Sequence, residues 1–528
     1  MLTGFARGLG AFSALAIATG APSFNVSNVF GSHGVLQRGK ANAVWGWAAS
    51  PAAPATVRVT WLDGTTYSGS SDATGLWRVQ LAPWPAVAQP FSLAFVSSAG
   101  DNVTLEDLLV GDVLSCNGQS NVGAVQVSAM ANASDIVAAA AALGGRLRLF
   151  QVSGNEQSDV PLSEWPASGL GPWQTPIAPG GSDALLLSFS AVCYILGQTL
   201  VTDYLVGDAA VPVGLIHSSH GGTSIQAWLS PAGADQCGDN SNSWNSSALY
   251  NSNFHPLTVG PLSLSAIYYY QGEEDVGIGA TETYWRAQWF GCSLQELIRD
   301  WRARLADSSL FFVVQELHAW MHTADIGLAT FRQAQHKALL QPRVALSTAF
   351  DGGDPASAMA GSPGGTVHSH LKFIPGRRAA AALAGAFYGL PVPYLNPRYL
   401  DATALETSNA THTALTVRVT LAPGTVTGAG LVLRGWEPQS NSSHCPTERN
   451  VTANYCDWFA IQTNDGAFSW HNASVALSGD LAGIVLSAVV PGAGLAAVAT
   501  RFGWGDWPVA TVYSAEGLPL RTWMKSLN

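Results

Sequence analysis

Charged side chains are scarce in this chain of 528 residues. Only 11% of the residues are charged, and acidic residues outnumber basic ones, so that the formal net charge is −11. A protein that binds nucleic acid needs a basic stripe or patch on its surface. The small number of basic residues therefore argues against a nucleic-acid partner.

Long apolar runs are missing after the first residues. A membrane-spanning helix needs about 20 consecutive apolar residues, and no such run follows residue 21. Residues 1–21 combine Arg7, a short apolar stretch and small residues at Ala18 and Ala21, which is the pattern of a secretory signal peptide. We therefore expect removal of this leader and no membrane span in the remaining chain.

Cysteines are also few, with six in the whole chain. Disulfides are expected where the compartment is oxidising. The most favoured pair is Cys445 with Cys456, and Cys237 with Cys292 is plausible, whereas Cys116 and Cys193 lie in apolar runs and are interpreted as buried free thiols.

Sequons for N-glycosylation are frequent and agree with such a compartment. They begin at Asn25, Asn102, Asn132, Asn245, Asn409, Asn441, Asn450 and Asn472. Together with the leader and the cysteines, they predict a glycoprotein that is secreted or resides in the lumen of a compartment such as the lysosome.

Motifs for metal binding are missing too. The histidine pairs His217 with His220 and His368 with His370 have a conceivable spacing, but no His-Glu-x-x-His motif or cysteine cluster accompanies them. Structural and catalytic zinc sites are normally built from such sets. We expect no metal and no cofactor.

Hydrophobic periodicity divides the rest of the chain into three regions. Residues 24–110 alternate apolar and polar positions between turn residues, which predicts an antiparallel β domain resembling a small sandwich. Residues 111–393 predict an α/β domain whose mainly parallel sheet lies between helices. Residues 394–528 return to a β-rich pattern. The strands expected in the α/β region are 147–152, 213–217, 265–270, 310–315 and 344–349, and the helices are 189–205, 284–305 and 330–340.

Three polar motifs each follow a predicted strand of the α/β region. They are Gly118-Gln-Ser-Asn121, Gly221-Gly222-Thr223 and Gln271-Gly-Glu273. Parallel strands end at the same edge of a sheet, and ligands of open α/β folds bind there. We therefore expect the three motifs to meet at one rim.

Ser120 is the candidate nucleophile of this rim. A strand, a glycine and a serine that opens a helix expose the hydroxyl above the sheet, where free N–H groups suit a developing oxyanion. Taken alone, such a stretch is more often an ordinary strand-to-helix turn in which serine caps the helix. The Gly-x-Ser-x-Gly motif is absent, which disfavours an α/β-hydrolase.

Taken together and in order, these motifs resemble the sialate O-acetylesterase family, which belongs to the SGNH hydrolases. The stretches that carry the resemblance are Val35-Leu-Gln-Arg38, Gly111-Asp-Val, Gly118-Gln-Ser-Asn121, Val213-Gly-Leu-Ile, Gly221-Gly-Thr-Ser-Ile-Gln-Ala-Trp228, Tyr270-Gln-Gly-Glu273, Asp300-Trp-Arg302 and the segment from Tyr513 to Leu518. The resemblance implies a flavodoxin-like SGNH hydrolase domain in residues 111–393, flanked by β-sandwich-like regions.

The resemblance also implies roles for individual residues. Ser120 matches the nucleophile and His368 the base, while Gly222 and Gln271 match the oxyanion donors. A second group, His220 and Trp228, lies where the substrate pocket is expected.

Some positions depart from the family pattern. Ser369 replaces a proline, Gly365 replaces an aspartate three residues before the base, and His220 and Tyr269 replace tryptophans. The acid that orients His368 is therefore open. Asp351, Asp354 and Glu273 are the candidates, and a Ser-His dyad oriented by a backbone carbonyl is a further option.

The sequence thus predicts a serine esterase that removes O-acetyl groups from carbohydrate through an acetyl-serine intermediate, with O-acetylated sialic acid as the favoured substrate. An acetylated polysaccharide such as xylan is the alternative substrate. A sugar-binding glycoprotein with a degraded active site is the alternative from another class. No sequence pattern indicates an oligomeric state.

Overall fold

A computed structural model of the chain describes residues 24–48, 54–152, 157–166, 173–178, 180–238, 246–276, 283–320, 327–354, 357, 365–434, 459–505, 507–508 and 510–527. The fold is mixed α/β, with one mixed sheet and a separate antiparallel sheet. No helix in these ranges combines the length and the apolar character needed to span a bilayer.

A run of parallel strands forms the centre of the molecule. In spatial order these are β9 (Leu147–Val152), β10 (Val213–Ser219), β8 (Asn102–Gly118), β11 (Ala266–Tyr270), β12 (Phe311–Gln315) and β13 (Val344–Ser347), and all neighbours pair in parallel. Every residue of β11 and β12 is buried, as expected for strands covered on both faces. The strands predicted in this region are confirmed to within two residues.

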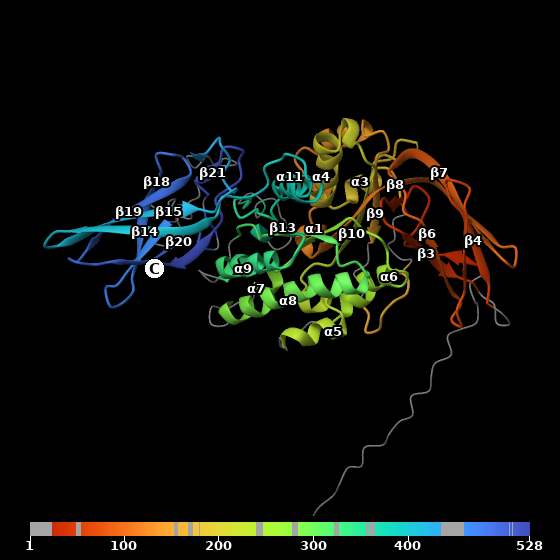
Figure 1. Cartoon of the computed structure of the whole chain (residues 1–528), viewed down its shortest axis with the longest axis horizontal. Coiled ribbons are helices and arrows are strands. Elements are labelled where there is room, and N and C mark those ends of the chain that lie inside the picture. Colours follow the sequence, from red (N-terminus) through yellow and green to blue (C-terminus); the bar gives the residue numbers. More distant parts are fainter. Residues whose placement is uncertain are drawn as a thin grey trace, which may run out of the picture.

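Helices cover both faces of this parallel sheet. Helices α4 (Ala191–Thr199) and α11 (Phe373–Ala382) pack together on one face, whereas α8 (Thr283–Arg304) and α9 (Gly327–Gln335) pack together on the other (Figure 1). The predicted helices are confirmed. Helix α9 is followed directly by the 3₁₀ segment η7 (His336–Leu340), which completes the helix predicted at 330–340.

The N-terminal β region surrounds its own apolar core. One sheet contains β1 (Asn25–Val26), β3 (Asn42–Trp47) and β6 (Leu76–Leu81), and the other contains β5 (Thr66–Ser70), β4 (Thr56–Thr60) and β7 (Val87–Ser97), which pairs with the first half of β8. These strands pair antiparallel, whereas β2 (Val35–Gln37) pairs with β8 in parallel. Strand β8 crosses the boundary expected at residue 110, so it belongs to the N-terminal sheet and to the parallel sheet.

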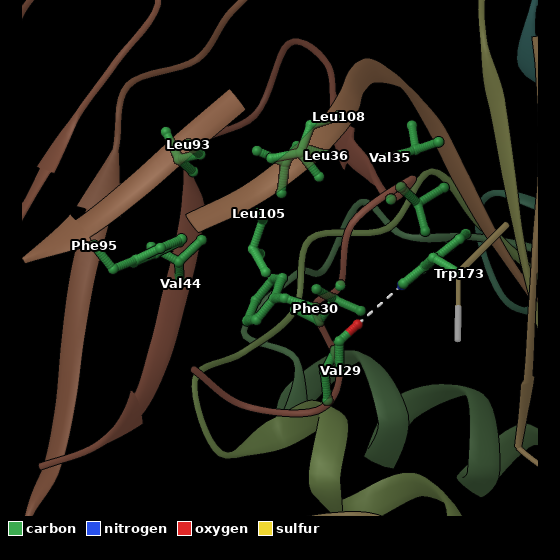
Figure 2. Close-up of a pocket in the computed structure, with 14 residues that line it drawn as sticks. Val29, Phe30, Val35, Leu36, Val44, Leu93, Phe95, Leu105, Leu108 and Trp173 are labelled. Atoms are coloured by element: carbon green, nitrogen blue, oxygen red, sulfur yellow. Dashed lines mark hydrogen bonds between the residues drawn. The ribbon is translucent and has the colours of Figure 1, made fainter. Parts of the chain in front are cut away.

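The N-terminal region and the parallel sheet also share an apolar contact (Figure 2). The Trp173 indole N–H donates to the Val29 carbonyl at 3.1 Å across it. A cavity of about 20 Å³ remains between side chains such as Phe30, Val35 and Leu108. That volume holds roughly one water molecule. The junction is therefore closely packed and has no room for a larger ligand.

The C-terminal region is a separate antiparallel sheet with its own core. Its spatial order is β14 (Tyr399–Ser408), β15 (His412–Leu421), β19 (Gly483–Pro491), β18 (Trp470–Leu477), β17 (Phe459–Thr463), β20 (Ala497–Phe502) and β22 (Trp523–Ser526). A small ladder of β16 (Leu431–Leu433) and β21 (Val512–Ser514) lies beside it. The predicted return of β structure is confirmed.

Disulfides correct one prediction. Cys116 and Cys193 are bonded to each other, with their Cα atoms 6.0 Å apart, so their interpretation as free thiols is wrong. The bond joins β8 to α4, and the apolar surroundings that suggested buried thiols are the packing of that helix on the sheet. The pair Cys237–Cys292 is confirmed. The favoured pair, Cys445 with Cys456, lies outside the described residues.

Candidate active site

The three polar motifs lie at one edge of the parallel sheet. Gly118, at the end of β8, is in register with Ser219 of β10 and with Tyr270 of β11. Each motif therefore begins within one or two residues of the same position along the strand direction of the sheet. The strand order also changes direction at β8, where the chain continues first to one side and later to the other, and such switch points form ligand-binding crevices.

The turn before Ser120 requires glycine. Gly118 has φ +145°, and a Cβ atom placed there would lie 1.9 Å from the Tyr270 carbonyl oxygen. The next residue, Gln119, donates its N–H to that carbonyl at 3.2 Å. The close approach of the two strands thus ends β8 sharply and leaves Ser120 as the first residue of helix α1 (Ser120–Gly123).

Helix α1 contains only four residues. A long helix carries a larger dipole, so α1 contributes chiefly the N–H groups of its first turn, which have no partner within the helix. The sequence correctly predicts that a helix begins at Ser120. Its length is shorter than the Val/Ala-rich sequence suggests.

The Gly221–Gly222 turn lies directly beside Ser120. The His220 N–H donates to the Gly118 carbonyl at 3.0 Å, and a Cβ atom at Gly221 would lie 3.3 Å from the Ser120 Cβ atom. Gly222 has φ +65°, a conformation that glycine adopts without strain. Backbone N–H groups of this turn are therefore close to the serine side chain.

Gln271 is committed to a structural role. Its side-chain N–H groups donate to the Thr223 carbonyl at 2.8 Å and to the Asp275 carboxylate. Both amide hydrogens are thus engaged, and Gln271 is only 1% exposed. Through these bonds Gln271 fixes the glycine turn to the end of β11. The role of oxyanion donor that the resemblance implies stays a prediction.

Asp275 is a site residue that sequence reasoning missed. It lies at the end of the short helix α7 (Glu273–Val276) and accepts from the Ile225 N–H at 3.0 Å as well as from Gln271. Burial raises the pKa of this carboxyl to about 7. Its position four residues after Gln271 is the signal that could have identified it, because such pairs face each other on a helical turn.

The residues next to Ser120 and His368 are hydrogen-bonded to each other. The Asn121 side chain donates to the Val367 carbonyl at 2.9 Å, which joins the residue after the serine to the residue before the histidine. His368 itself is 9% exposed. Burial, reinforced by the positive charges of Lys372 and His370, lowers the pKa of His368 to about 4.

Asn121 also organises a buried charged network. It donates to Glu273 at 2.5 Å and accepts from the Lys372 ammonium at 2.6 Å. The ammonium also lies 5.7 Å from the centre of the Tyr270 ring. Burial raises the pKa of Glu273 and lowers that of Lys372. Lys372 was not identified from the sequence, where a lone lysine before a helix is a common surface feature.

The three candidate acids have different surroundings. Asp351 forms an ion pair with Arg378 at 2.5 Å and accepts from the Tyr513 hydroxyl at 3.1 Å, so it is occupied away from His368. Asp354 accepts the His370 N–H at 3.1 Å and thereby contacts the segment that carries the base. Glu273 contacts Asn121. Glu273 thus contacts the residue after Ser120, and Asp354 contacts the residue two positions after His368.

The two expected substrate-contacting residues differ in accessibility. His220 is partly exposed at the glycine turn, and burial lowers its pKa. Trp228 is fully buried, donates to the Thr223 hydroxyl at 3.1 Å and packs against Trp301. Its side chain thus supports the glycine turn, and a contact between Trp228 and substrate stays a prediction.

The histidine pairs do not assemble a metal centre in the described ranges. No group of three His, Cys, Asp or Glu side chains with suitable geometry occurs in this part of the chain. His217 is buried below the rim and bonds to the Ser219 hydroxyl at 2.9 Å.

Comparisons with known proteins agree with the resemblance seen in the sequence. A family model described as carbohydrate esterase, sialic acid-specific acetylesterase, matches residues 192–356. The sialate O-acetylesterase of Homo sapiens is 32% identical over 301 residues, which is 53% of either chain. That of Mus musculus is 29% identical over 324 residues, which is 53% of this chain and 56% of the mouse protein. The chain thus spans about half the length of the curated relatives it matches.

A solved structure extends the likeness to nearly the whole chain. A carbohydrate acetylesterase from Xanthomonas citri superposes with a TM-score of 0.73 at 25% identity, covering 95% of this chain and 99% of that one. The predicted resemblance to sialate O-acetylesterases is confirmed. The segment matched by the family model contains Gly222 and Gln271, whereas Ser120 and His368 lie outside it.

Proposed function

We propose that this protein is a serine esterase that removes O-acetyl groups from carbohydrate, with Ser120 as nucleophile and His368 as base. The observation that carries the proposal is the position of Ser120, which opens a helix at the sheet edge beside the Gly221–Gly222 turn. The Asn121 contact to Val367 brings the histidine segment to the same place. The esterase relatives support the same reaction class.

In the proposed reaction the Ser120 oxygen attacks the acetyl carbonyl carbon, and His368 takes the serine proton. The low pKa of His368 keeps its ring neutral at neutral pH, as a proton acceptor requires. The negative oxygen of the tetrahedral intermediate is held by N–H groups of Ser120 and the glycine turn. The sugar oxygen leaves with the proton from His368, which yields acetyl-serine.

Water then completes the cycle. His368 takes a proton from water, the resulting hydroxide attacks the acetyl-serine carbonyl, and the Ser120 oxygen leaves and recovers the proton. No cofactor enters either half of the cycle. Gln271 acts through the turn it anchors, so it is a positioning residue for the oxyanion site.

The proposed catalytic region is of the flavodoxin-like SGNH type. If the edge strand β9 is set aside, the parallel strands follow the order β10, β8, β11, β12, β13. In chain order this is 2-1-3-4-5, which is the flavodoxin-like arrangement. The lumenal or secreted location is likewise part of the proposal. Two disulfides are compatible with it, and four sequon asparagines, Asn102, Asn132, Asn409 and Asn472, are exposed.

Hydrolysis of p-nitrophenyl acetate by the purified full chain tests the reaction. We expect turnover that falls at least about a thousandfold in Ser120→Ala, because covalent catalysis is lost. Ser219→Ala, a serine on the neighbouring strand end, is the matched control and should keep activity. Equal turnover above the spontaneous rate in the protein and in Ser120→Ala would refute Ser120 as the nucleophile. Hydrolysis by the unaltered protein no faster than the spontaneous rate would refute the esterase and favour a sugar-binding role.

Substrate choice needs a second measurement. Acetate release from O-acetylated sialic acid is compared with release from acetylated xylan at equal acetyl concentration. We expect the sialic acid substrate to be preferred, as the names of the relatives suggest. Preference for xylan would keep the esterase chemistry and overturn the substrate.

A further inference from the structure

A groove of about 690 Å³ lies between helices α8 and α9 and the C-terminal sheet. One wall comes from the start of α8, from α9 and from η7, and the other from the start of β14 and from β22. Figure 1 shows α9 beside the end of the chain marked C. The volume is within the usual range of small-molecule sites, roughly 300 to 1,000 Å³. None of the residues proposed for catalysis lines it.

The groove is strongly basic in an otherwise acidic protein. Lys337, Arg398, Arg521 and Lys525 line it, and no aspartate or glutamate is among its lining residues. The chain has only four lysines and a net charge of −11, and two of those lysines are here. Cations gathered in a groove raise the local concentration of anions, so this charge distribution favours an anionic ligand.

Two buried polar atoms of the groove lack a partner in the described structure. They are the Nε of Arg521 and the hydroxyl of Thr522, a residue that is 5% exposed. Buried donors are nearly always paired, so adjacent unpaired donors indicate a group that binds from the groove.

The charge of Arg521 is incompletely balanced. Burial lowers its pKa to about 10, and the neighbouring Arg398 acts in the same direction. The negative charge of Glu316 raises the pKa of Arg521. That carboxylate already binds His336 at 2.6 Å and the Thr348 hydroxyl.

We propose that this groove binds an acidic saccharide, with the carboxylate of a sugar held by Arg521, Thr522 and the surrounding cations. Arginine is suited to a carboxylate because its guanidinium presents several donors in a fixed plane. Gln288 and Gln333 add amide groups for sugar hydroxyls, and Tyr284, which is 71% exposed, offers an aromatic surface at one end. The site is separate from Ser120, and the inference holds whether or not the esterase proposal does.

Calorimetric titration of the full chain with sialyllactose, an acidic trisaccharide, tests the proposal, with neutral lactose as the matched ligand. The groove variant combines Lys337→Gln, Arg398→Gln and Lys525→Gln, which are partly or fully exposed positions. The control variant combines Arg58→Gln and Arg418→Gln, two exposed arginines outside the groove. We expect sialyllactose binding that weakens with salt and falls at least tenfold in the groove variant, while the control variant binds normally and lactose does not bind.

Three results would overturn the proposal. They are unchanged sialyllactose binding in the groove variant, equal binding of lactose, and displacement of sialyllactose by polyglutamate at equal carboxylate concentration. Hydrolysis of p-nitrophenyl acetate is measured on the same variants and should be unchanged, because that substrate is too small to need the groove. Loss of saccharide binding with normal turnover therefore separates this inference from the esterase.

Discussion

At the residue scale, the environment of His368 determines the form of the proposed base. Its low pKa arises mainly from burial and in part from the charges of Lys372 and His370. A base that is neutral above about pH 4 can accept a proton in an acidic lumen, where an ordinary histidine with a pKa of about 6.5 would be mostly charged. This property fits the compartment predicted from the sequence.

Alanine substitutions distinguish the candidate histidines. We expect His368→Ala to reduce kcat by about 10³ or more with the fold intact, because the serine loses its proton acceptor. His220→Ala should mainly change KM, since His220 borders the glycine turn, and His370→Ala should have the least effect. Steady-state kinetics and circular dichroism on each variant provide the measurement. Full turnover in His368→Ala together with its loss in His220→Ala would reverse the assignment.

The pH profile reports the charge of Lys372. Burial lowers the pKa of its ammonium to about 7, so it is positive in acid and disfavours protonation of His368. In the wild type we expect kcat/KM to rise with pH through about 4. Lys372→Met removes the repulsion, so the pKa of His368 rises and this limb moves to higher pH. Arg377→Met, at an exposed residue of the helix α11 that Lys372 precedes, is the control. If the acidic limb of the kcat/KM profile keeps its position in Lys372→Met, the charge of Lys372 does not lower the pKa of His368.

Sequence reasoning at this scale identifies residues but not their orientation. The resemblance points to Gln271 and Trp228, yet the amide of Gln271 is bonded to Thr223 and Asp275, and Trp228 is buried behind the turn. A motif specifies which side chains lie near a site. The hydrogen bonds that point a side chain toward or away from it depend on contacts with distant segments, such as Lys372 with Asn121.

At the scale of elements, periodicity predicts most of the α/β region. Apolar runs such as β11 and β12 are buried on both faces, and the amphipathic α8 and α9 cover the sheet, so pattern and burial agree. The Cys116–Cys193 bond is different, because its partners are 77 residues apart in sequence. Their proximity follows from the packing of α4 on β8, which local pattern does not contain.

Gly118→Ala tests the junction of β8, β11 and α1. The added Cβ would meet the Tyr270 carbonyl at 1.9 Å, and φ is +145°, so the strands must separate or the turn must change. We expect a loss of unfolding free energy of about 3 kcal/mol or more, from overpacking and backbone strain together. Gly428→Ala, where no atom lies within 4 Å, is the control for denaturant unfolding. Comparable stability of the two variants would show that the junction tolerates a side chain.

At the scale of the whole molecule, the parallel sheet is attached to a β region at either end. Strand β8 belongs to both sheets on the N-terminal side. On the other side, Asp351, which is paired with Arg378, accepts a hydrogen bond from the Tyr513 hydroxyl of β21. Composition and periodicity predict a three-part organisation. They do not predict a strand shared by two regions, because a continuous apolar run gives no sign of where its pairing partners change.

Asp351→Asn tests this attachment and the candidate acid together. Asp351 and Arg378 are 9% and 15% exposed at the side chain, and removing one charge of a buried pair typically costs about 3–5 kcal/mol because the other remains unpaired. We expect a large fall in the melting temperature but nearly unchanged kcat per folded molecule, since Asp351 is bonded away from His368. Tyr513→Phe removes a single hydrogen bond to Asp351 and should cost about 1 kcal/mol. If Asp351→Asn instead lowered kcat by orders of magnitude at a temperature where it is fully folded, Asp351 would be the orienting acid. Asp354 and Glu273 would then be excluded as the orienting acid.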